Sequence, residues 1–93
     1  MMLNEVIKVV LADFNLQHPS RHFSSDELIT FLYQFHAELL HHSYDEAIEK
    51  IKPVVKKRLQ SLAASNVIID DQGSSLHLAS EDLYVIRREA ATK

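Results

Sequence analysis

The chain of 93 residues contains no cysteine and no tryptophan, and it has only one glycine and two prolines. Without cysteine it has no disulfide bond, no thiolate metal site and no cysteine nucleophile, which fits a reducing compartment. The chain has no basic segment followed by an apolar one, which is the pattern of a signal peptide. No apolar run approaches the roughly 18 residues that a membrane span requires. We therefore expect a cytoplasmic protein that does not cross a membrane.

The scarcity of glycine and proline also leaves no obvious linker, internal repeat or low-complexity tract. A length of 93 residues with 46% hydrophobic residues is typical of one globular domain. We predict a single domain over residues 1–93, with a core formed by residues 3–79 and a C-terminal helix over residues 80–92.

Two amphipathic helices are predicted in the first part of the chain. Apolar residues recur every three or four positions from Leu3, and this helix should end before His18-Pro19, because proline disfavours helical geometry in the residue before it. Residues 20–23 are expected to be extended. A second helix should begin at Ser24, which forms a capping box with Glu27. Its predicted apolar stripe is Leu28, Phe31, Leu32, Phe35 and Leu39.

A third helical region follows a second possible capping box, formed by Ser43 and Glu46. Its apolar stripe is Tyr44, Ile48, Ile51, Val55, Leu59 and Leu62. Pro53 interrupts it, so the region is either one kinked helix or a short helix followed by a new one with Pro53 in its first turn. We favour the break, and we expect Asn66 to end the helix in a left-handed conformation.

The periodicity then changes from helical to strand-like. Residues 67–70 and 76–79 are predicted to pair as antiparallel strands around Gly73, which can adopt the positive φ of a hairpin loop. Ser80 and the two acidic residues after it are typical of a helix start, so we predict a last helix with Leu83, Ile86 and Ala90 facing inward. The stretch LYVIR within it is also compatible with a strand.

Two segments resemble the winged helix-turn-helix superfamily of transcription regulators. The stretch VVKKRLQSLAASNVI (residues 54–68) resembles its recognition helix, and RHFSSDEL (residues 21–28) is similar to its entry from a strand into the second helix. The resemblance implies a mainly α fold with a small β-hairpin, in the order helix, short strand, helix, helix, strand, wing, strand and helix. It also implies sequence-specific binding to double-stranded DNA.

Charge is concentrated on the third helical region. Residues 50–58 carry a charge of +5, whereas the rest of the chain carries −8, for a net charge of −3. At about 100° per residue from Val55, the positions near the opposite face are Lys50, Lys57, Gln60 and Ala64, and Lys56 and Ser61 flank that face. The residues that the resemblance assigns to DNA are Lys50 and Lys52 on phosphates, and Lys56, Lys57, Gln60 and Ser61 in the major groove.

The acidic net charge predicts weak, salt-sensitive DNA binding unless the basic face is doubled. We therefore expect a homodimer formed through Leu83, Ile86 and Ala90. The loop DDQGSS has no Lys or Arg for a minor groove. The alternatives for the basic face are a solvated surface or a winged-helix interaction module that binds an acidic protein partner.

The remaining polar residues favour neither a metal nor catalysis. His36, His41 and His42 are near one another in sequence, but adjacent histidines point in different directions on a helix and no cysteine assists them. We interpret them as surface residues near a turn. The chain has no Gly-rich phosphate loop and no nucleophile motif. The sequence therefore predicts no metal, no cofactor and no enzymatic activity.

Overall fold

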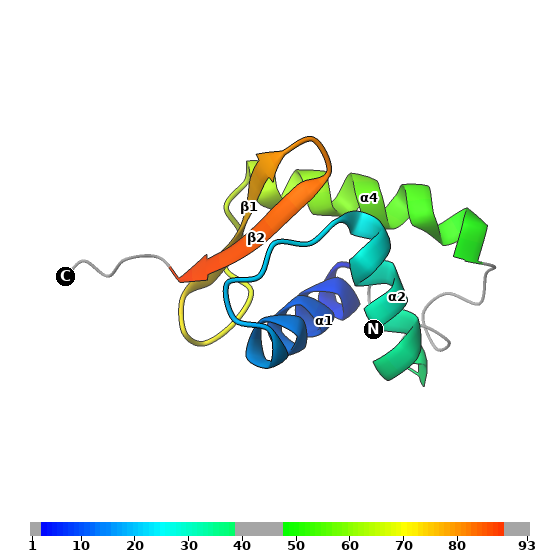
Figure 1. Ribbon diagram of the computed structural model, residues 1–93, viewed down its shortest axis with the longest axis horizontal. Helices are drawn as coiled ribbons and strands as arrows, with labels where there is room; N and C mark the ends of the chain where they lie inside the picture. Colours follow the sequence, from blue (N-terminus) through cyan, green and yellow to red (C-terminus); the bar gives the residue numbers. More distant parts are fainter. Residues whose placement is uncertain (1–2, 39–47, 89–93) are drawn as a thin grey trace.

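The computed structural model describes residues 3–38 and 48–88. In these segments the elements are α1 (Leu3–Gln17), α2 (Ser25–Phe35), α4 (Ile48–Ala64), β1 (Ser74–Ser80) and β2 (Leu83–Arg88). The strands form an antiparallel hairpin on one side of the molecule, and α4 runs above α1 and α2 in the view of Figure 1. The predicted α+β class is confirmed. The finer winged-helix order, with four helices and three strands, is not matched by the described residues.

The first two helices follow local signals in the sequence. α1 ends at Gln17, directly before His18-Pro19, as predicted. Ser24 caps α2, because its hydroxyl accepts from the Glu27 amide at 3.2 Å while the Glu27 carboxylate accepts from the Ser24 amide at 3.0 Å. The predicted stripe was wrong at Phe35, which is 54% exposed at the end of α2. Leu39 lies outside the described residues.

α4 is one helix from Ile48 to Ala64, and the break predicted at Pro53 was wrong. Ile51 and Val55 on either side of Pro53 are both fully buried, so one apolar face continues past the proline, whose ring lies on the exposed side. The predicted end was correct: Asn66 has a φ of 50°. The amides of Asn66 and Val67 donate to the carbonyls of Ala63 and Leu62, the pattern of a Schellman cap. The capping box predicted at Ser43 and Glu46 lies outside the described residues.

The hairpin differs most from the prediction. The turn at Gly73 exists, with a φ of 78° and with the Asp70 carboxylate accepting from the Ser74 amide. However, the residues on its two sides pair only through a single antiparallel bridge, between Ile68 and Ser75. The extended pairing is between β1 and β2, so the helix predicted over residues 80–92 was wrong and the strand alternative for LYVIR was correct. Asp82 reverses the chain with a φ of 50°, a conformation that aspartate tolerates better than most residues.

Burial explains why residues 83–88 form a strand. Tyr84, Val85 and Ile86 are consecutive, and each is at most 5% exposed, which a helix at the surface would not allow. Phe23 pairs with Tyr84 through two backbone hydrogen bonds of 2.9 and 2.7 Å, so the end of the segment predicted to be extended lies beside β2. The prediction was wrong at Ser20, which lies in a turn with a φ of 60°. The Phe23 ring also packs at 4.8 Å from Phe14 and 6.1 Å from Tyr84. These rings join the hairpin to the helical core.

The surface predicted for a homodimer is not present in the expected form. Ile86 is 2% exposed and belongs to the core, and Leu83 lies in β2 rather than on a helix. Ala90 is outside the described residues. Self-association itself therefore stays a prediction, without the helical surface that was expected to carry it.

Candidate nucleic-acid interface

The predicted DNA-binding residues lie on the exposed side of α4. Between residues 50 and 64 of this helix, the buried side chains are Ile51, Val55, Leu59 and Leu62. The residues assigned to DNA from the sequence are all exposed, namely Lys50, Lys52, Lys56, Lys57, Gln60 and Ser61. The helical periodicity thus placed all of them except Lys52 correctly with respect to the core, and Lys52, only about 60° from Val55 around the helix, is exposed as well. With Lys57 and Gln60 almost opposite the buried stripe, the two side chains point away from the domain.

Neighbouring helices hold the two edges of this surface. The Lys52 ammonium lies 3.2 Å from the Asp26 carboxylate in the first turn of α2. The Arg58 guanidinium donates to the Asn4 side-chain oxygen of α1 at 3.1 Å. Lys56 and Lys57 make no hydrogen bond or ion pair with any residue of the two described segments. These two lysines are therefore the cations on α4 most available to an external anion, whereas Lys52 is partly neutralised.

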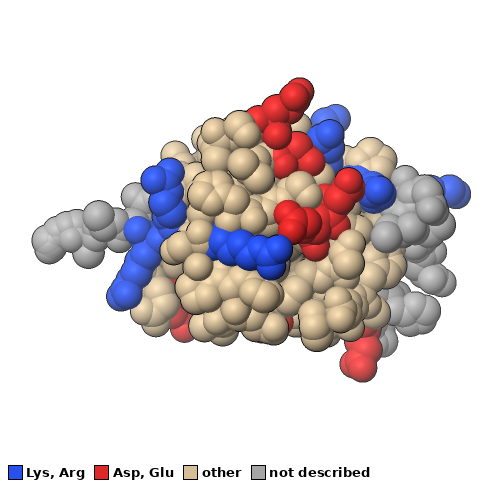
Figure 2. Space-filling view, in the orientation of Figure 1, with Lys and Arg blue, Asp and Glu red and all other residues tan. Residues whose placement is uncertain are grey.

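Acidic residues border the same surface. Asp26 and Glu27 occupy the first turn of α2, and the hairpin turn contributes the exposed Glu81. Asp82 accepts a hydrogen bond of 2.9 Å from the Ser25 hydroxyl, which fixes this turn beside the start of α2. In Figure 2 the basic groups are interrupted by acidic ones rather than forming a continuous patch. Around α4 the basic groups therefore alternate with acidic ones, and the turn between β1 and β2 carries no cation for a minor groove.

The sequence reasoning missed two exposed cations. Arg87 and Arg88 end β2, and they were assigned to the helix that the structure replaces with a strand. No motif in the sequence distinguishes them from other surface arginines. They extend the exposed positive charge beyond α4, at the end of β2 away from the turn.

The histidines form no metal site among the described residues, where no three His, Cys, Asp or Glu side chains come together. His36 instead lies 2.8 Å from the Asp13 carboxylate through its Nε2 atom, linking the end of α2 to α1. His41 and His42 lie outside the described residues. In the same segments, no helix has the length and apolar character needed to cross a bilayer.

The pair of Asp13 and His36 predicts that part of the stability of the fold is lost at acidic pH. Its hydrogen bond with His36 is the main cause that lowers the pKa of Asp13 below 3.8, and Gln17 adds a further hydrogen bond. A lowered pKa stabilises the folded state above the unfolded pKa, and this stability is lost as the pH falls through the folded pKa. We expect Asp13→Asn to reduce the loss of stability between about pH 5 and 2, by less than about 1 kcal/mol because the pair is partly exposed.

Urea denaturation followed by circular dichroism at several pH values would measure this effect. Asp71→Asn, at an exposed position in the turn before Gly73, is the matched control. An equal change in both variants would contradict a role for the pair.

Comparisons with protein-family models, with curated proteins and with solved structures found no match to this chain.

Proposed function

We propose that the chain is a winged-helix DNA-binding domain that places α4 in the major groove of duplex DNA and regulates transcription. The observation that carries the proposal is the joint exposure of Lys56, Lys57, Gln60 and Ser61 on one face of α4, with both lysines free of carboxylates in the described segments. Lysines in these positions neutralise phosphates or contact guanine, and glutamine can bind the edge of adenine.

The arrangement of the neighbouring elements supports this reading. The chain runs from α1 through the extended residue Phe23 into α2, then through α4 into the β1–β2 hairpin. The bridge between Phe23 and Tyr84 places that extended residue beside the hairpin, as the third strand of a winged helix would be. In the proposed complex α4 makes the contacts, and the short acidic turn at Glu81 stays away from the phosphates.

A salt-dependent titration of labelled duplex DNA, first at low ionic strength, tests the proposal. Binding through four phosphates would give a slope of log affinity against log salt of about −3.6. On a preferred site selected from random duplexes, Gln60→Ala should weaken binding by about 1–3 kcal/mol, with little effect on random duplex, if Gln60 contacts a base edge. A wild-type protein without salt-sensitive binding at low ionic strength would overturn the proposal.

A protein-interaction module is the second candidate, and the mixed charge of this surface favours it. Asp26 lies beside Lys52 of α4, and Glu27 and Glu81 are near it in the first turn of α2 and in the turn that Asp82 holds against Ser25. These carboxylates would be repelled by the uniformly negative backbone of DNA. A protein partner with an acidic patch for Lys56 and Lys57 and basic residues at its edge would complement both signs. If the wild-type protein does not bind DNA, and variants of Lys56 and Lys57 lose binding to a protein partner, the results would support this alternative.

A further inference from the structure

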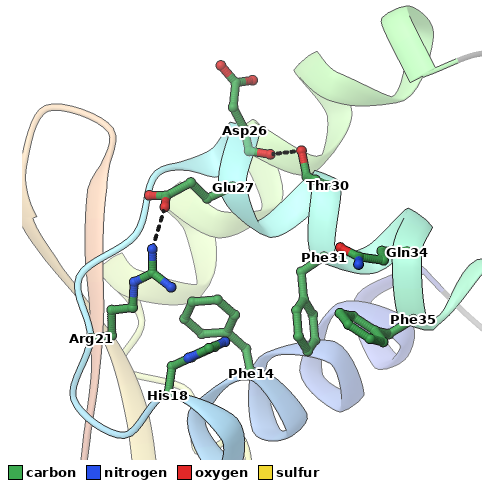
Figure 3. Close-up of a pocket in the computed structure, with 9 residues that line it drawn as sticks. All are labelled: Phe14, His18, Arg21, Asp26, Glu27, Thr30, Phe31, Gln34 and Phe35. Atoms are coloured by element: carbon green, nitrogen blue, oxygen red, sulfur yellow. Dashed lines mark hydrogen bonds and ion pairs between the residues drawn. The ribbon is translucent and has the colours of Figure 1, made fainter.

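A groove between α1 and α2 has not been used by the proposed function. It has a volume of about 480 Å³, and none of its lining residues belongs to α4. Figure 3 shows that its floor consists of the rings of Phe14, His18, Phe31 and Phe35, while Arg21 and Glu27 lie at its edge. We call this feature the α1–α2 groove. Its volume is within the range of small-molecule sites, which are typically about 300–1,000 Å³.

The aromatic floor is one continuous cluster with an exposed end. Phe31 lies edge-on to Phe14 at a centroid distance of 5.3 Å, and it lies 4.8 Å from Phe35. Phe14 also contacts the His18 ring at 5.1 Å. Phe14 and Phe31 are nearly buried, whereas Phe35 is 54% exposed. A flat apolar molecule in the groove would cover Phe35 and stack on rings whose positions are already fixed by packing.

The edge of the groove carries a cation with spare hydrogen-bond donors. The Nη2 atom of Arg21 donates to one oxygen of Glu27 at 3.1 Å, and the other oxygen of Glu27 accepts from the Ser24 amide at 3.0 Å. Both oxygens of Glu27 are thus engaged within the protein. A guanidinium has five N–H groups, and this one spends only one of them on Glu27. Asp26, the other carboxylate at the groove, is paired with Lys52 of α4.

We propose that the α1–α2 groove binds a small aromatic carboxylate, with its ring on Phe31 and Phe35 and its carboxylate on Arg21. The apolar floor selects a ring, and the remaining N–H groups of Arg21 select an anion, because both carboxylates at the edge already have cationic partners. This inference goes beyond the proposed function and holds whether or not α4 binds DNA. The site would give the domain a ligand of its own.

A three-compound panel tests the charge and the ring separately. Binding of 2-naphthoate, neutral 2-naphthalenemethanol and cationic 2-naphthylmethylammonium would be followed by two-dimensional NMR of the labelled full chain. A ligand of this size at about 0.3 kcal/mol per heavy atom predicts a Kd on the order of 1 mM for the carboxylate. We expect the carboxylate to bind at least about fivefold more tightly than the other two, as one partly exposed ion pair allows. Shifts should be centred on Arg21, Phe31 and Phe35.

Two variants of opposite sign sharpen the test. Arg21→Gln should weaken binding of 2-naphthoate about fivefold and leave the neutral alcohol unchanged. Glu27→Gln should strengthen binding of 2-naphthoate, since it removes the competing carboxylate and glutamine can still complete the capping box. Arg88→Gln, which removes an exposed arginine outside the groove, is the charge-matched control and should change nothing.

Either of two results would overturn the inference. If 2-naphthoate caused no saturable shifts at about ten times the expected Kd, the groove would be only a surface hollow. Equal binding of the three compounds, with Arg21→Gln and Glu27→Gln both without effect, would show that no anion site exists at Arg21. Because DNA is absent from these titrations, failure here leaves the α4 proposal to its own test.

Discussion

Replacing Tyr84 with alanine is expected to lower the free energy of unfolding by about 3–5 kcal/mol, the usual effect of removing a buried aromatic ring. Tyr84 is fully buried, and it joins the hairpin to Phe23 and through it to Phe14. Small domains have a total free energy of unfolding of about 5–15 kcal/mol, so this loss would remove a large part of the stability of the fold. Urea denaturation followed by circular dichroism would measure it.

Tyr84→Phe is the matched variant, and its expected effect is small. The buried hydroxyl of Tyr84 has no hydrogen-bond partner among the described residues, and neither has the Oδ1 atom of Asp82. Removing an unpaired buried hydroxyl while keeping the ring should change the free energy of unfolding by less than about 1 kcal/mol, in either direction. If Tyr84→Phe were as damaging as Tyr84→Ala, the hydroxyl rather than the ring would hold the hairpin.

The burial of Tyr84 beside Asp82 also predicts that the stability of the fold depends on pH in the alkaline range. Burial, and then the negative charge of Asp82, raise the pKa of Tyr84 above 10.0. Because the folded pKa is higher than the unfolded one, the stability is complete below about pH 10 and is lost as the pH rises through the folded pKa. Wild type should therefore lose more stability than Tyr84→Phe above about pH 10. Parallel stability curves for the two proteins would contradict this assignment.

Reversing the charge of Lys56 and Lys57 on α4 is the second change with a large expected effect. If the domain binds DNA, Lys56→Glu with Lys57→Glu should weaken binding roughly 100-fold or more at low salt and flatten the salt slope by about two units. Both side chains are exposed and make no ion pair with a described residue, so the fold should be unchanged by circular dichroism. Fluorescence anisotropy of a labelled duplex at several salt concentrations measures both quantities.

Arg87→Glu with Arg88→Glu supplies the control. Each Lys→Glu or Arg→Glu change removes two units of charge, so either double variant brings the net charge from −3 to −7. The two double variants make the same change in net charge at different places, since Arg87 and Arg88 lie at the end of β2. Equal weakening by both doubles would show attraction to overall charge rather than a contact at α4.

The helix ends were predictable because they depend on interactions among a few neighbouring residues. The reciprocal hydrogen bonds of Ser24 and Glu27, and the left-handed conformation of Asn66, require only the local chain. The exposed face of α4 was predictable for a related reason, since a period of 3.6 residues sorts side chains relative to the apolar stripe. The break predicted at Pro53 was wrong because the local penalty of proline was given more weight than the apolar face of Ile51 and Val55, whose burial keeps α4 continuous.

By itself, the sequence determined the α+β class, the caps of α2 and α4, and the outward position of the lysines, since these follow from side-chain spacing and short-range hydrogen bonds. Only the tertiary structure decided that β1 pairs with residues 83–88, because Ser80, Glu81 and Asp82 suit a helix start and a turn equally well. The choice depended on Tyr84 reaching Phe23, a contact between distant parts of the chain. The same long-range packing placed Arg21 beside the aromatic floor of the α1–α2 groove and Asp26 beside Lys52, because distances between separate elements are set by the core that joins them.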